Sequence, residues 1–406
     1  MRGSVDAVEL AGPRTKNLEA VPAQTRVAKN GTPEIVFGPG ALADVGICAL
    51  RSGARRPFLV TDPGLIEAGW VAEAVGHLRL SGLRPVVWHD ITPNPKDHEV
   101  EAAFAAYRDS ACDLVIGLGG GSCIDAAKSV AILAGNGGRI LDYEGVDLVT
   151  RPLPVTMMVP STSGTGSDVT QFAVITDTVH LVKAVIISEA VVPDISIIDP
   201  RLLTTMPEWL NAATGLDALT HGIESFVSRA HSPLTDRRAL DAVRLVARHL
   251  DRTMDRPEEA GSRMAMAQGA LEAGMAFTSA ILGATHAMSH QVGGLLDAPH
   301  GVINGVLLPH VIRFNAQVDP GRYVPLAAAA GVDVGRCSPE DAAHLLADKV
   351  ERLADAVGVP SGLRAVGLTE EAIPRLAATT LKDACMATNP RQATRDDVER
   401  LFREAL

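Results

Sequence analysis

The chain has 406 residues, of which 47% are hydrophobic and 21% are charged, and this composition excludes an intrinsically disordered protein. A formal net charge of −11, without a basic stripe interleaved with aromatics, argues against nucleic acid as a partner. No apolar run is long enough for a membrane span, the first six residues do not resemble a secretory signal, and the five cysteines form no C-x-x-C pair. We therefore expect a cytoplasmic protein with reduced thiols and no membrane partner.

The first part of the chain predicts a flexible arm followed by an α/β domain. Residues 1–30 are polar, mixed in charge and without a sustained period, whereas short apolar runs alternate with helical patterns in residues 31–205. This alternation predicts a parallel sheet with helices on both faces. The expected helices include Leu65–Leu80 and Glu99–Arg108, and the expected strands are Glu34–Phe37, Phe58–Thr61, Pro85–Trp88, Leu114–Leu118, Val155–Val159 and Ile195–Ile198.

The second half of the chain predicts an all-helical domain over residues 206–406. After Asp199 the sequence is rich in Ala, Leu, Met and Arg, and no strand is expected. Long periodic segments predict helices over Asp236–Asp251, Gly261–His290 and Pro339–Val357. The cleft between the two domains is the default position for an active site.

A glycine-rich segment follows the apolar run that ends at Leu118. Gly119, Gly120, Gly121 and Ser122 lie between this strand and the next expected helix. Glycines allow close approach of a phosphate, and the free N–H groups of a helix start attract the anion. The segment predicts a site for a dinucleotide pyrophosphate, although it is neither a G-x-G-x-x-G motif nor a P-loop, and a simple tight turn remains the alternative.

Asp62 ends an earlier expected strand, just before Pro63. A carboxylate at such a strand end can accept hydrogen bonds from an adenosine ribose and repels a 2′-phosphate, which favours NAD over NADP. An equally good interpretation is that Asp62 caps the helix that begins at Pro63.

Two helical segments carry a cluster of potential metal ligands. Asp217 and His221 are four residues apart, His286 and His290 repeat that spacing, and His300 follows in a turn. Side chains four residues apart share one helix face, so two such pairs and a turn residue can surround a divalent ion. One carboxylate with several imidazoles suits Fe²⁺, or alternatively Zn²⁺, better than Mg²⁺ or Ca²⁺.

These features together resemble the iron-dependent (group III) alcohol dehydrogenases, from about Glu34 to Leu406. The strings that carry the resemblance are the glycine loop with Asp125 and Lys128, Pro160–Thr170 (PSTSGTGSDVT), Ala213–His221 (ATGLDALTH), His286–Gly301 (HAMSHQVGGLLDAPHG) and Thr388–Arg391 (TNPR). The resemblance implies a dehydroquinate synthase-like architecture, in which an α/β dinucleotide-binding domain precedes a helical metal domain. It also implies nicotinamide-dependent interconversion of a small alcohol and an aldehyde, and a homodimer.

The resemblance further implies roles for individual residues. The metal ligands would be Asp217, His221, His286 and His300, and His290 would be a non-ligand that transfers a proton. Cofactor contacts would come from Thr162, Thr165 and, by a looser alignment, Lys183, in addition to the glycine loop, Asp62 and Asp125. Phe172, Phe277 and Cys385 would form the wall of the substrate pocket.

Related activities stay open at this point. A hydroxyacid–oxoacid transhydrogenase would use bound cofactor and paired substrates, and a specialised reductase would take an anionic aldehyde such as phosphonoacetaldehyde. A metal-binding scaffold of the same fold is the non-catalytic alternative.

Overall fold

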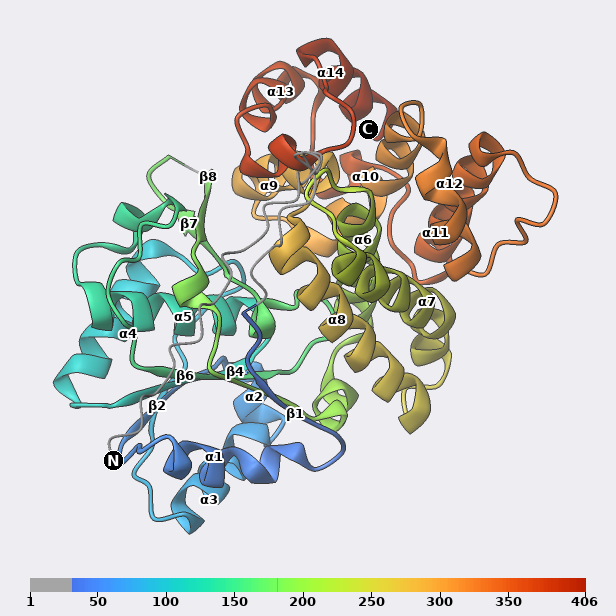
Figure 1. Ribbon diagram of the computed structural model, residues 1–406. Helices are drawn as coiled ribbons and strands as arrows, with labels where there is room; N and C mark the ends of the chain where they lie inside the picture. The colour runs from blue at the N-terminus through green and yellow to red at the C-terminus, as the bar shows by residue number, and fades with distance from the viewer. Residues whose placement is uncertain (1–30, 181) are drawn as a thin grey trace, which may run out of the picture.

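The computed structural model describes residues 31–180 and 182–406, so the expected arm over residues 1–30 lies outside the described residues. Within these residues, the first half of the chain forms an α/β domain and the second half forms a helical domain beside it (Figure 1). The chain changes from strands to helices between Ile198 and Glu208.

The main sheet is entirely parallel. Its strands are, in spatial order, β1 (Glu34–Phe37), β9 (Ile195–Ile198), β6 (Val155–Pro160), β4 (Leu114–Gly119), β2 (Pro57–Val60) and β3 (Val86–Trp88). The chain runs outward from β2 to β3, and then returns to the other side of β2 to form β4. The sheet therefore has its topological switch point between β2 and β4, which is where ligands of open parallel sheets bind.

Helices cover both faces of this sheet, as the alternation in the sequence predicted. On one face α1 (Val45–Arg51) and α3 (Trp70–Leu80) pack against Leu59 and Ile116, and on the other α4 (Asp97–Asp109) and α5 (Gly121–Asn136) pack against Phe58 and Val115. Neighbouring residues of one strand thus face opposite cores, which explains why these buried strands are apolar throughout.

Two features of the α/β domain were not predicted. The expected helix Leu65–Leu80 is two helices, α2 (Pro63–Glu67) and α3, because Gly69 takes a left-handed φ of 85° between them. A second sheet combines β5 (Gly145–Val146), β8 (Val182–Ile187) and β7 (Phe172–Asp177), of which β7 and β8 are antiparallel. The signal for β7 and β8 was two β-branched runs separated by a short polar turn.

The C-terminal domain is built from helices, and residues 199–406, all of which are described, contain no strand, as predicted. The helices are α6 (Glu208–Val227), α7 (Pro233–Asp255), α8 (Ala260–Ala280), α9 (Ala284–Leu296), α10 (His300–Asn315), α11 (Tyr323–Ala329), α12 (Pro339–Ala356), α13 (Ile373–Thr380) and α14 (Arg395–Glu404). The helix predicted over Gly261–His290 was wrong in its continuity, because the chain breaks between α8 and α9, where Ile281 has a φ of 57°.

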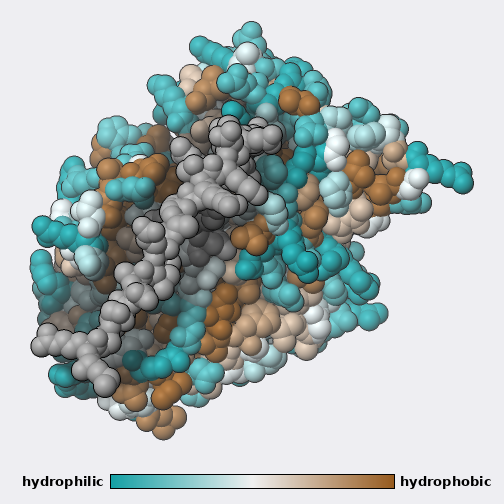
Figure 2. All heavy atoms as spheres, in the orientation of Figure 1, coloured by the Kyte–Doolittle hydropathy of each residue, from teal (hydrophilic) through white to brown (hydrophobic). Residues whose placement is uncertain are grey.

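The outer surface mixes hydrophilic and hydrophobic residues. Hydrophobic residues appear as separate brown areas among teal ones on the face shown in Figure 2. Among the described residues, no helix is long and apolar enough to cross a membrane.

Candidate active site

The four predicted metal ligands converge in the helical domain. Asp217 and His221 lie one turn apart on α6, His286 lies in the first turn of α9, and His300 opens α10. The Asp217 Oδ1 atom lies 3.8 Å from His221 Nε2, 3.6 Å from His286 Nε2 and 3.8 Å from His300 Nε2. Ligand atoms about 2.1 Å from one tetrahedral ion lie roughly 3.4 Å apart. The ligand atoms of Asp217, His221 and His286 all lie within 4.8 Å of one another, so these three fit a single metal ion, and His300 lies beside Asp217 as a fourth donor.

Burial and charge make this cluster a strongly perturbed environment. Burial lowers the pKa of His221 to about 4 and places the pKa of His300 well below its usual value. Burial alone would also lower the pKa of His286, but its contacts with the Asp217 and Glu224 carboxylates outweigh this effect and raise the pKa to about 9. The two buried carboxylates therefore favour positive charge at this centre, and the donor set fits a divalent cation.

Three further polar side chains hold the ligands from outside, and the sequence analysis did not find them. Glu224 Oε2 lies 2.7 Å from His286 Nδ1, Ser289 Oγ lies 2.9 Å from His300 Nδ1, and Asn304 Nδ2 donates to Asp217 Oδ1 at 2.7 Å. Such outer contacts fix ligand orientation and tautomer. The available signal was helical spacing, because Glu224 follows His221 by three residues and Asn304 follows His300 by four.

Glu224 also explains why the chain breaks before α9. Its buried carboxylate accepts hydrogen bonds from the backbone N–H groups of Gly283 at 3.0 Å and Thr285 at 2.7 Å. These are free donors of a helix start, so the carboxylate from α6 acts as a cap for α9. The same side chain thus sets both the beginning of the helix and the orientation of His286.

We expect Glu224→Gln to weaken metal affinity by about 10–100-fold, because an amide is a poorer partner for the His286 imidazole than a carboxylate. Competition with a chelator of known affinity measures this change. Glu272→Gln is the matched control, since Glu272 pairs with Arg238 on α7 at 2.9 Å and makes no contact with the ligands. Equal affinities of the two variants would contradict this role of Glu224.

His290 lies one turn beyond His286 on α9, and its side chain contacts residues other than Asp217. Its Nδ1 atom lies 2.9 Å from Asp383 Oδ2, and its ring stacks on that of His300 with 5.5 Å between centroids. Asp383 was missed by the sequence analysis because it lies 93 residues away along the chain. This carboxylate fixes the His290 ring and leaves Nε2 as its other exchangeable position.

The residues predicted for the substrate pocket meet beside the metal ligands. Phe172, Phe277 and Cys385 belong to one buried apolar cluster with Ile187, Leu282 and Ala287. The Phe277 ring stacks on His221 with 4.3 Å between centroids, and Phe172 lies 5.5 Å from Phe277. The wall is therefore continuous with the metal centre.

The glycine loop lies at the switch point of the parallel sheet. Gly119 ends β4 with a φ of 153°, and a Cβ atom on Gly121 would lie 2.7 Å from Thr165 Cγ2. A side chain at Gly121 would collide with Thr165, and one at Gly119 would collide with Cys123, whose Sγ atom would lie 2.6 Å away, so both positions require glycine. The loop leads into the N-terminus of α5 at the carboxyl edge of the sheet, and such a helix start favours a phosphate group.

Asp62 stands beside this loop, at the end of β2. Its Oδ1 atom accepts a hydrogen bond from Leu65 N at 3.0 Å, so it caps α2, and Cys123 Sγ donates to its Oδ2 atom at 3.2 Å. The helix-cap interpretation is therefore confirmed. Asp62 also lies next to the glycine loop, since its Oδ2 atom would be 3.4 Å from a Cβ atom on Gly119.

The other residues predicted to contact the cofactor differ in position. Thr162 and Thr165 face Gly120 and Gly121, whereas the partly buried Asp125 carboxylate accepts hydrogen bonds from Ser167 Oγ and, at 3.2 Å, from Val174 N. Ser122 Oγ accepts a hydrogen bond from Asn94 N at 3.1 Å. Asp125 and Ser122 thus tie the loop to neighbouring segments.

Lys183 lies on β8 and is largely enclosed. Its Nζ atom donates to Thr176 Oγ1 at 3.0 Å, and burial lowers its pKa to about 8. The side chain also approaches α9, since its Cε atom would lie 3.9 Å from a Cβ atom on Gly293.

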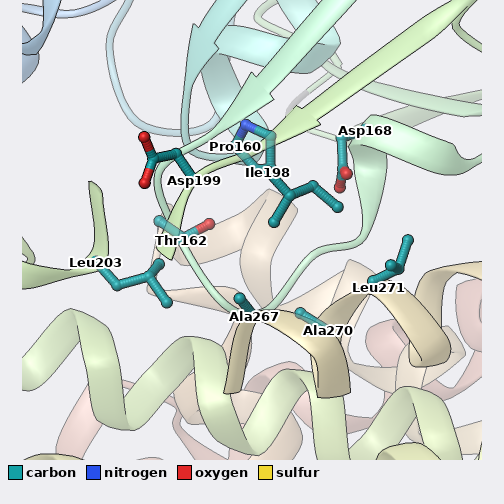
Figure 3. Close-up of a pocket in the computed structure, with 9 residues that line it drawn as sticks. All are labelled: Pro160, Thr162, Asp168, Ile198, Asp199, Leu203, Ala267, Ala270 and Leu271. Carbon is teal, nitrogen blue, oxygen red and sulfur yellow. The ribbon is translucent and has the colours of Figure 1, made fainter. Parts of the chain in front are cut away.

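A small pocket lies between the two domains, where the carboxyl ends of β6 and β9 face α8. Figure 3 shows Pro160, Thr162 and Ile198 on the sheet side, and Ala267 and Ala270 on the helix side. The four predicted metal ligands do not line it. This pocket therefore marks the domain junction rather than the metal centre.

Known proteins match the whole described chain. A family model for iron-containing alcohol dehydrogenases matches residues 32–200, and one for the C-terminal part of the Fe-containing alcohol dehydrogenase family matches residues 211–406. The chain is 41% identical to a 1,3-propanediol dehydrogenase of Citrobacter freundii over 371 residues, covering 91% of this chain and 96% of that protein. It is 37% identical to an NAD-dependent methanol dehydrogenase of Bacillus methanolicus over 374 residues, covering 92% and 98%.

The fold comparison agrees with these matches. The crystal structure of a 1,3-propanediol oxidoreductase superimposes with a TM-score of 0.91 at 39% identity, covering 94% of this chain and all of that one. This match confirms the predicted fold class of an α/β domain followed by a helical domain. The chain therefore belongs to the iron-containing alcohol dehydrogenase family, as its sequence motifs implied, and is an alcohol dehydrogenase or aldehyde reductase of that type.

Proposed function

We propose that this chain exchanges a hydride between NAD and a small neutral alcohol or aldehyde, with Fe²⁺ held by Asp217, His221, His286 and His300. The convergence of these four side chains next to an apolar wall is the observation that carries the proposal. A bound divalent ion supplies Lewis acidity toward an alcohol or carbonyl oxygen. The same donors also suit Zn²⁺, so which ion the protein holds in the cell depends in addition on the availability of each metal.

The proton that accompanies the hydride is assigned to His290. Asp383 holds His290 Nδ1, so the proton moves at Nε2, and the 9% exposure of His290 gives it a route to solvent. Asp383 acts as a positioning residue, since its carboxylate fixes the orientation of the His290 ring.

The apolar wall favours a small substrate without charge. Phe172, Phe277 and Cys385 offer no charged group for an anionic tail, and their cluster lies against His221. The similarity to a propanediol dehydrogenase and a methanol dehydrogenase supports the same substrate class. We also propose a cytoplasmic homodimer, which light scattering of the purified protein tests.

The glycine loop and Asp62 support NAD as the cofactor. Gly119, Gly120 and Gly121 lead into the N-terminus of α5, which favours a pyrophosphate, and Thr162 and Thr165 pack against this loop. The Asp62 carboxylate at the end of β2 opposes a 2′-phosphate. Asp125, Ser122 and Lys183 support this site by holding the surrounding segments in place.

We expect Asp62→Ser to shift the preference from NADH toward NADPH by about tenfold or more, which corresponds to roughly 1.4 kcal/mol. Serine keeps a helix-capping oxygen while removing the negative charge, so the cap of α2 should survive. Steady-state kcat/KM with both cofactors measures the ratio, and thermal unfolding checks the cap. Asp109→Ser, at the exposed end of α4, is the control, and an unchanged ratio in Asp62→Ser would contradict the ribose role.

The direct test is oxidation of NADH by anaerobically purified protein reloaded with Fe²⁺, using neutral, carboxylated and phosphonylated aldehydes. We expect the fastest turnover with a small neutral aldehyde, and its loss on addition of a chelator. Turnover only with a hydroxy acid and an oxo acid together would instead indicate the transhydrogenase. If no substrate supported NADH oxidation although metal was bound, the result would support the alternative of a non-catalytic scaffold.

A further inference from the structure

A second set of metal-binding donors lies next to the catalytic centre. His290, Asp383 and Cys385 each place a ligand atom within 4.8 Å of those of the other two. The tightest pair is His290 Nδ1 and Asp383 Oδ2, at 2.9 Å. Ligand atoms around one tetrahedral zinc ion lie about 3–4 Å apart, so a side-chain shift of roughly an ångström completes the geometry.

The surrounding structure holds these three side chains in place. Asp383 caps the turn that carries Cys385, because its Oδ1 atom accepts a hydrogen bond from Cys385 N at 2.9 Å. His290 comes from α9, so the donors meet across two elements that pack together, with side-chain exposures of 10% for His290 and 8% for Asp383. The three donors are therefore already held together before an ion binds.

The donor types select a particular class of ion. A cysteine sulfur, an imidazole and a carboxylate suit Zn²⁺ and similar thiophilic cations, whereas Mg²⁺ and Ca²⁺ prefer oxygen alone. The four ligands proposed for iron contain no sulfur, so the two sites differ in chemistry. Binding at the second site would release the thiol proton of Cys385 to solvent, since the thiolate is the ligand.

We propose that His290, Asp383 and Cys385 form a second, inhibitory site for a thiophilic divalent cation such as zinc. An ion there occupies a ring nitrogen of His290 and an oxygen of Asp383, so the pair can no longer hold and pass a proton. Zinc in excess therefore stops the iron-loaded enzyme without displacing its iron. The binding stands on the geometry alone, whereas its inhibitory effect rests on the role proposed above for His290.

Cobalt distinguishes the two sites, because only the second contains a thiolate. Iron-loaded protein is titrated with Co²⁺ under anaerobic conditions, and near-ultraviolet absorption is recorded together with the iron and cobalt content after desalting. We expect a thiolate-to-cobalt charge-transfer band that saturates at one equivalent, with iron retained. The band should disappear in Cys385→Ala and persist in Cys48→Ala, a matched control because Cys48 is equally buried, in the core beneath the main sheet.

Zinc inhibition provides the second measurement. The concentration of Zn²⁺ that halves activity should rise about tenfold or more in Cys385→Ala, relative to that variant's own activity without zinc, because a direct ligand is lost. Asp383→Asn should also lose the cobalt band, which covers the case in which Cys385→Ala fails to fold. Absence of the band in the wild type, its persistence in Cys385→Ala, or uptake of cobalt with an equal loss of iron would each overturn the proposal. None of these spectroscopic outcomes depends on turnover, so they are distinct from a failure of the proposed reaction.

Discussion

Replacing His286 with alanine is expected to remove metal binding and turnover together. His286 Nε2 lies 3.6 Å from Asp217 Oδ1, and both residues are almost completely buried, so bulk water does not readily take the place of the imidazole. The change also leaves the buried Glu224 carboxylate without its imidazole partner, which costs about 1–3 kcal/mol of folding stability. Metal analysis, the turnover assay and thermal unfolding of the same preparation measure the three effects.

The control for this change is His344→Ala, since His344 is exposed on α12 and should affect none of the three quantities. His286→Ala protein that kept a full complement of iron would contradict the ligand assignment. If the inactive protein unfolded at a temperature much lower than the loss of about 1–3 kcal/mol explains, the result would indicate misfolding. Asp217→Asn then repeats the test with a side chain of nearly the same size and shape.

Replacing His290 with alanine should lower the turnover rate without removing the bound metal. His290 pairs with Asp383 rather than with Asp217, so iron should remain bound while kcat falls by about 10²–10⁴, the range for loss of a general acid–base group. Anaerobic metal analysis and steady-state turnover of the same preparation measure both.

Asp383→Asn tests the positioning role beside it. The asparagine keeps the size of the side chain but not its charge, so we expect a smaller fall in kcat than in His290→Ala, with iron retained. A His290→Ala protein that came out free of metal would show that the division between ligand and proton relay is wrong.

The parts of this site that were predictable are those set by local helix geometry. The pairs Asp217 with His221 and His286 with His290 could be recognised because residues four apart share one helix face. The glycine loop could be recognised because it joins an apolar strand directly to a helix. The order of strands along the first domain followed from the same kind of local pattern. Such features need no knowledge of which elements pack together.

The missed features depend on contacts between distant segments. Glu224 meets His286 across 62 residues and Asp383 meets His290 across 93, so no spacing rule connects them. The break at Ile281 was invisible for the same reason, since the apolar period continues through it while the cap that starts α9 comes from α6. The strands β7 and β8 were missed because they belong to a separate small sheet outside the strand–helix alternation.

The predicted metal ligands and the predicted cofactor-binding residues lie in different domains, and this separation affects how such a protein can evolve. Every predicted metal ligand, and the contacts that orient it, comes from α6, α9 and α10, whereas the glycine loop and Asp62 belong to the parallel sheet. The two half-sites share Phe172 of β7 and Phe277 of α8, whose rings lie 5.5 Å apart. Substitutions that change cofactor preference can therefore arise almost independently of those that change metal binding. Substrate range, in contrast, depends on residues from both domains.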